Sequence, residues 1–165
     1  MKRIFLPLND RDVKGLKKGE EVLLSGIIYT ARDQAHKRLV ELLKKKKRSP
    51  VELKGATIYY CGPTKTRPGK AIGSCGPTTS ARMDSFTPQL LKAGLKGMIG
   101  KGSRSKEVID AIKRYKAVYF AAIGGAGAYL SKKVKKAKAV AFKGLGPEAI
   151  YKLEVTNFPV VVMLK

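Results

Sequence analysis

The chain has 165 residues, 44% of them apolar, which excludes global disorder and predicts one globular domain over residues 1–165. Lys and Arg outnumber Asp and Glu by 35 to 12, and the net charge of +23 favours nucleic acid, an acidic partner subunit or an acidic substrate as binding partner. The longest uncharged stretch, residues 117–130, is too short to span a bilayer, so we expect a soluble protein without a membrane segment.

The first half of the chain predicts strands separated by one helix and a long loop. Residues 1–30 look mainly β, and EVLLSGIIYT at 21–30 has the β-branched enrichment of a strand. Residues 32–47 predict an amphipathic helix, since its apolar residues recur on one face. A short apolar strand at 55–63 then ends in Gly-Pro, and residues 64–74 predict an ordered loop.

The second half continues the alternation of helices and strands. Thr87 and Pro88 suit the N-cap and first position of a helix that stops near Gly94. The further predicted elements are a strand and turn at 96–102, a helix capped by Ser103 or Ser105, a strand at 117–125, a helix at 126–134, a strand at 137–145, a short helix at 147–153 and a last strand at 158–164. This pattern predicts an α/β fold with a mixed sheet flanked by helices.

Cys61 and Cys75 are the only cysteines in the sequence. Two thiols are too few for a structural zinc site and too few to hold an iron–sulfur cluster unaided. Because no secretory signal pattern is recognisable, we expect free thiols in a reducing cytoplasm.

The placement of the lysines argues against specific nucleic-acid binding. The densest run, KKKKR at 44–48, ends a predicted helix, where cations suit the negative end of the helix dipole. No zinc-finger spacing, basic-zipper heptad or aromatic RNA-binding strand is present. A basic nucleic-acid-binding module is kept only as an alternative function.

The sequence has few Asn and Gln residues and many lysines, a composition that favours a thermophilic source.

The segment GSCGPTTSARMD, residues 73–84, has the composition of an anion site. Gly-Pro forces a turn, after which Thr78 or Thr79 can cap a helix whose free N–H groups favour a carboxylate or phosphate. Arg82 lies one helical turn after Thr78, so its guanidinium can return to the same end. The simpler alternative is a capped helix with a surface arginine.

Two other fragments add cations of the same kind. Arg32 and Asp33 open a helix directly after a strand, and Lys101 lies between glycines that let the backbone approach a ligand closely. His36 is the only histidine, and a lone histidine on a helix is more often packed or exposed than catalytic. Together the three fragments offer two arginines, one lysine and threonine hydroxyls suited to a dicarboxylate.

Residues 73–102 closely resemble the C-terminal domain, or beta subunit, of class I iron–sulfur fumarases and L(+)-tartrate dehydratases. The resemblance extends in the same order over residues 27–39, 58–69, 121–130 and 145–160. It implies a swivelling β/β/α fold and a site shared with an N-terminal-type alpha subunit, in a hetero-oligomer. Three cysteines of that subunit hold a [4Fe-4S] cluster, so this chain should bind no metal itself.

The resemblance also implies roles for individual residues. Thr78 matches the threonine proposed to take the C3 proton, Arg82 and Arg32 match carboxylate-binding arginines, and Lys101 matches the substrate lysine. The implied activity is the reversible hydration of fumarate to L-malate, with tartrate dehydration as an alternative that these fragments do not separate. Three residues depart from the family pattern and bear on the partner surface more than on the activity: Ala31, Lys143 and Pro147.

Overall fold

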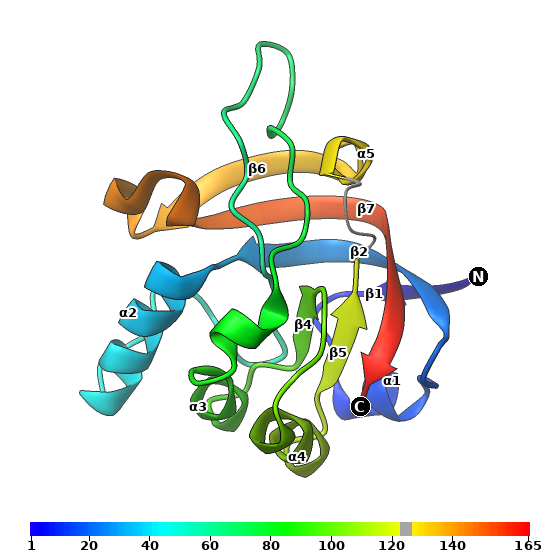
Figure 1. The fold of residues 1–165 in the computed structure, drawn as a ribbon. Coiled ribbons are helices and arrows are strands. Elements are labelled where there is room, and N and C mark those ends of the chain that lie inside the picture. Colours follow the sequence, from blue (N-terminus) through cyan, green and yellow to red (C-terminus); the bar gives the residue numbers. More distant parts are fainter. Residues whose placement is uncertain (123–126) are drawn as a thin grey trace.

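The computed structural model describes residues 1–122 and 127–165, and its mixed sheet closes into a barrel (Figure 1). Five strands form the barrel, in the order β2 (Glu21–Thr30), β3 (Thr57–Tyr59), β4 (Gly97–Gly100), β5 (Val118–Ala121) and β7 (Ile150–Leu164). The first four are parallel neighbours, and β7 runs antiparallel to both β5 and β2. The predicted α/β class with a mixed sheet is confirmed.

Two further strands extend the sheet. β1 (Lys2–Phe5) lies parallel to the first half of β2, and β6 (Val134–Ala141) pairs antiparallel with the first half of β7. The register between β2 and β7 shifts between Leu24 and Gly26, next to Asn157, whose φ is 51°. Asn tolerates this left-handed backbone better than most residues, so it suits a bulge in a strand of 15 residues.

The helices pack mainly on one side of the barrel. α2 (Asp33–Lys44), α3 (Thr87–Lys92) and α4 (Lys106–Arg114) lie together there (Figure 1). The remaining helical elements are α1 (Asp10–Lys14), α5 (Gly127–Ser131) and the 3₁₀ turns η1 (Ser80–Met83) and η2 (Lys143–Glu148).

Two cores meet across the sheet because strand side chains alternate between its faces. Tyr59 and Ile99 belong to the core inside the barrel, whereas the preceding Ile58 and Met98 belong to the core under the helices. α2 buries Ala35 in this second core. Strands buried on both faces carry the continuous apolar runs seen in the sequence.

Most predicted elements are confirmed, with small shifts at their ends. β2 has the predicted bounds, and α2 ends at Lys44, before the end of the basic run. Ser105, one of the two predicted caps, accepts a hydrogen bond from Val108 N at the start of α4. Of the predicted strand at 117–125, residues 123–125 lie outside the described residues, as does the first residue of the helix predicted at 126–134.

Four predictions about local structure are wrong. The short helix predicted at 147–153 is not formed, because β7 begins at Ile150 and pairs there with β6. β6 ends at Ala141, before the predicted end at 145. The N-terminal region is not purely β, since Asn9 and Asp12 form a capping box that starts α1. Thr87 does not cap α3, because its hydroxyl donates to Met83 O instead.

Candidate functional site

The carboxyl ends of β2, β3 and β4 lie at one edge of the sheet. Thr30 is paired with Tyr59, and Tyr59 with Ile99, so the three strands end side by side. Arg32 follows β2 and Lys101 follows β4. Ligands of parallel α/β sheets bind outside this edge, because the connecting loops and helix starts meet there.

The turn η1 lies across the same edge and is tied to it by backbone hydrogen bonds. Thr78 N donates to Tyr60 O at 2.7 Å, and Ser80 N donates to Lys101 O at 2.9 Å. Thr79 and Lys101 also form an isolated parallel bridge. The structure therefore brings the Thr78 segment and Lys101 together at this edge, although they lie far apart in the sequence.

The predicted helix cap in this segment is not formed. η1 is a single 3₁₀ turn, and Thr79 at its N-cap makes no side-chain hydrogen bond to it. A capping role therefore does not explain the Thr79 hydroxyl. The capped helix of the simpler alternative is not formed, but its surface arginine is present, because Arg82 is exposed.

Arg82 pairs with Asp33, and this contact joins η1 to the start of α2. Arg82 Nε and Nη2 both donate to Asp33 Oδ2, at 3.1 and 2.7 Å. Asp33 Oδ1 is buried and has no hydrogen-bond partner among the described residues. The sequence pointed to Asp33 only as a helix-start acid beside Arg32, so its contact with Arg82 was not predicted.

Arg32 lies against a glycine of the Gly-Pro break. A Cβ on Gly62 would lie 2.4 Å from Arg32 Nη1 and 2.8 Å from its Cδ, so only glycine leaves room for this guanidinium. Arg32 Nε is buried without a hydrogen-bond partner in residues 1–122 and 127–165. An unpaired buried donor costs about 1–3 kcal/mol, and a bound carboxylate would satisfy it.

His36 contacts the backbone of Arg32. Its Nδ1 lies 2.8 Å from Arg32 O, and because a carbonyl only accepts, Nδ1 carries the proton. The ring packs edge-on against Tyr60, and burial lowers the pKa of His36 to about 4. His36 is therefore a neutral, packed residue near neutral pH.

Lys101 is exposed at the edge, and its two glycines serve different purposes. A Cβ on Gly100 would lie 2.0 Å from Ser80 Oγ, so this glycine is required for packing against η1. Gly102 has a φ of +87° and open space around it, as a turn glycine does. Close approach of a ligand is thus not the reason for Gly100.

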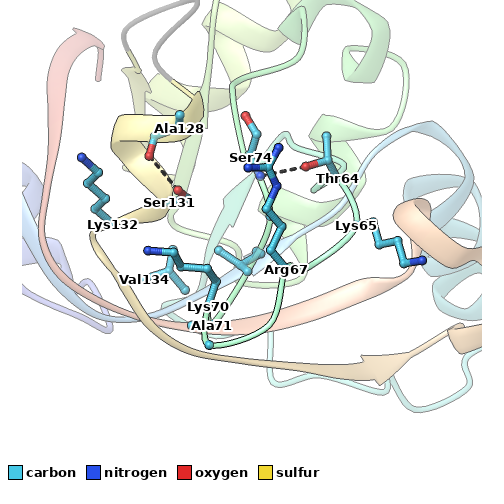
Figure 2. Close-up of a pocket in the computed structure, with 13 residues that line it drawn as sticks. Thr64, Lys65, Arg67, Lys70, Ala71, Ser74, Ala128, Ser131, Lys132 and Val134 are labelled. Carbon is cyan, nitrogen blue, oxygen red and sulfur yellow. Dashed lines mark hydrogen bonds between the residues drawn. The ribbon is translucent and has the colours of Figure 1, made fainter.

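A separate basic cavity of about 550 Å³ lies between the projecting 64–74 loop and α5 (Figure 2). Its polar lining residues are Thr64, Lys65, Arg67, Lys70, Ser74, Ser131 and Lys132. The base of the loop is fixed, because Thr64 N donates to Ser74 O and Ser74 N donates to Thr64 Oγ1. None of the predicted site residues lines this cavity, and its cations are exposed, so we place the site at the sheet edge.

Both cysteines are buried in the core inside the barrel. A hydrogen bond from the Cys61 thiol to Cys75, together with burial, holds the pKa of Cys61 above its ordinary value. Within the described part of the chain, no three His, Cys, Asp or Glu side chains are placed to hold a metal ion. In the same residues, no helix combines the length and the apolar character needed to cross a membrane.

Comparison with known proteins agrees with the resemblance seen in the sequence. Residues 2–165 match the family model described as the fumarase C-terminus. The chain belongs to this family. It is similar to the "Putative L(+)-tartrate dehydratase subunit beta" of Methanocaldococcus jannaschii, with 41% identity over 99% of this chain and 87% of that protein.

Two longer relatives are named as fumarate hydratases. The class I, aerobic fumarate hydratase of Salmonella typhimurium is 42% identical over 86% of this chain, and fumarate hydratase 2 of Leishmania major is 40% identical over 88%. The chain spans about a quarter of each, since the matches cover 25% of the Salmonella typhimurium protein and 26% of the Leishmania major protein. It therefore corresponds to one part of these proteins.

Proposed function

We propose that this chain is the beta-type subunit of an iron–sulfur hydro-lyase that interconverts fumarate and L-malate. The observation that carries the proposal is the sheet edge, where Arg32 Nε is buried without a partner among the residues that the structure describes, and Arg82 and Lys101 add two more cations. Fixed cations around a small space suit a substrate with two carboxylates. Membership of the fumarase C-terminal family supports the reaction class.

The proposed roles follow from the charge that the reaction creates. Removing a proton next to a carboxylate moves negative charge onto that carboxylate, so Arg32, Arg82 and Lys101 would stabilise the transition state more than the substrate. Thr78 would take the C3 proton, which requires nearby cations to lower the pKa of its hydroxyl. Arg82 uses Nε and Nη2 for Asp33, which leaves its third nitrogen for the substrate.

The [4Fe-4S] cluster of such an enzyme does not fit the residues of this chain. Cys61 and Cys75 lie in an apolar core, and the described residues provide no set of three ligands. We therefore propose that an alpha subunit carries the cluster and covers the sheet edge. The beta-subunit name of the similar Methanocaldococcus jannaschii protein supports such a partner.

L(+)-tartrate is the second candidate substrate. It has the dicarboxylate frame of malate with one more hydroxyl, and the Methanocaldococcus jannaschii relative with this name is matched over 87% of its length. The three cations of the edge suit both molecules equally.

The test is to co-express the chain with an alpha subunit that carries three cluster-binding cysteines and to assay the anaerobic complex. We expect fumarate to form from L-malate. Turnover of tartrate alone would make the second candidate correct, and turnover of neither substrate would refute the proposed function.

A further inference from the structure

Arg104 differs from the many surface cations of this lysine-rich chain because it is buried. Arg104 is the only Lys or Arg among the buried polar residues of the described chain, and its side chain is 0% exposed. The guanidinium lies between two aromatic rings, 5.2 Å from the centre of Tyr60 and 4.8 Å from that of Tyr119. Burying a cation costs several kcal/mol unless it is well paired, so its partners indicate what it does.

Those partners lie directly after Arg82 in the sequence. Arg104 Nε donates to Asp84 Oδ1 at 2.7 Å, and Nη2 donates to Thr87 Oγ1 at 3.0 Å. Asp84 Oδ2 accepts a second hydrogen bond, from Ser105 N, and the Thr87 hydroxyl donates to Met83 O. The guanidinium therefore fixes the carboxyl end of the η1 segment.

The two tyrosines fix the other end of the same segment. Arg104 Nη2 donates to the Tyr60 hydroxyl at 3.1 Å, and the carbonyl of Tyr60 accepts from Thr78 N. The Tyr119 hydroxyl donates to Gly102 O and lies 2.8 Å from Ser80 Oγ. One buried group thus holds residues 78–87 at both ends and holds the turn after Lys101 through Tyr119.

We propose that Arg104 is a positioning residue for the hydro-lyase reaction, which holds Thr78, Arg82 and Lys101 in one arrangement toward the substrate. The proposal rests on the proposed function. Arg104 itself is buried and acts through these three residues. A displacement of about 1 Å at reacting groups lowers turnover roughly 100-fold, so loss of this support should appear in kcat.

The kinetic test uses Arg104→Met in the assembled complex, since Met keeps much of the length and removes all donors. We expect kcat to fall roughly 100-fold. In a Thr78→Ala background the same change should lower kcat by a smaller factor, because one of the three positioned groups is already absent. An equal fold-loss in both backgrounds would overturn the proposal. Arg114→Met is the matched control, since Arg114 is exposed and stacks on Tyr115 away from the site.

Amide hydrogen exchange of the full chain gives a readout that does not depend on activity. Arg104→Met should speed exchange at Thr78 and Ser80 while the β2 and β7 amides stay protected. Unchanged exchange at Thr78 and Ser80, or a uniform rise over the barrel, would overturn the proposal. If Arg104→Met does not fold, Arg104→Lys is used instead, because lysine keeps the charge and lacks the planar fork of donors. If the wild-type complex turns over neither dicarboxylate, the proposed function is wrong. Hydrogen exchange then still tests whether Arg104 fixes residues 78–87.

Discussion

Replacing Arg82 by lysine tests whether Arg82 binds substrate or is only a surface arginine. Arg82 donates from two nitrogens to Asp33 Oδ2, at 3.1 and 2.7 Å, and its third nitrogen is proposed to bind a substrate carboxylate. Lysine keeps the positive charge but has one compact ammonium group in place of the planar fork. It cannot hold Asp33 and a carboxylate in the same geometry.

Arg82→Lys should lower activity strongly and stability only slightly. Loss of one charge-assisted hydrogen bond costs about 1.5–3 kcal/mol, which lowers kcat/KM roughly 10- to 150-fold. The ion pair is partly exposed, with 48% of the Arg82 side chain and 32% of the Asp33 side chain accessible. Exposed pairs contribute about 0–1 kcal/mol to the free energy of unfolding, so Tm should fall by less than about 4 °C.

The assay compares kcat, KM and Tm of the Arg82→Lys and wild-type complexes, with Arg48→Lys as control. Arg48 is exposed and lies beyond the C-terminal end of α2, whereas Arg32 and Asp33 lie at the N-terminal end of this helix. Wild-type kcat/KM in Arg82→Lys would refute a substrate role for Arg82. A large loss of Tm beside the loss of activity would show that the residue acts on the fold instead.

Three further predictions test other parts of the site. Thr78→Ala should lower kcat sharply while KM and Tm change little, whereas Thr79→Ala should keep wild-type kcat; equal kcat in the two variants would remove Thr78 as the base. His36 has a folded pKa of about 4, below its ordinary 6.5, so the unfolded chain binds more protons and stability falls as pH falls through this range. Urea unfolding should show that the contribution of His36 lowers the free energy of unfolding by about 2 kcal/mol between pH 7 and pH 5. This pH-dependent loss should be absent in His36→Leu. Filter binding should show DNA binding that vanishes near physiological salt, and persistence there would favour the nucleic-acid module.

The fold was largely predictable because its elements carry strong local signals. β2 is a β-branched run and α2 has a clear apolar face, and both lie where the sequence predicts them. The errors fall where partners decide the structure. Residues 150–153 have a helix-like composition, but pairing with β6 and β2 extends β7 through them. Such pairing involves residues far away in the sequence, so no local pattern reveals it.

The site was predictable as a set of residue types and not as a set of contacts. Thr78 and Arg82 were visible because they follow a Gly-Pro break, Lys101 because it lies between glycines, and Arg32 because it opens a helix directly after a strand. The pairing of Asp33 with Arg82, and the burial of Arg104, depend on how α2, η1 and β4 meet at the sheet edge. The sequence gives no local reason to distinguish Arg104 from the 34 other basic residues.

The most direct test of the account is the activity of the two subunits apart and together. The isolated chain and an isolated alpha subunit would each be assayed anaerobically on L-malate, and then the mixture. The account predicts a colourless, inactive chain and turnover only in the mixture, because this chain supplies the carboxylate-binding groups and the partner supplies the cluster. Turnover by the isolated chain, or full turnover by the alpha subunit alone, would contradict it.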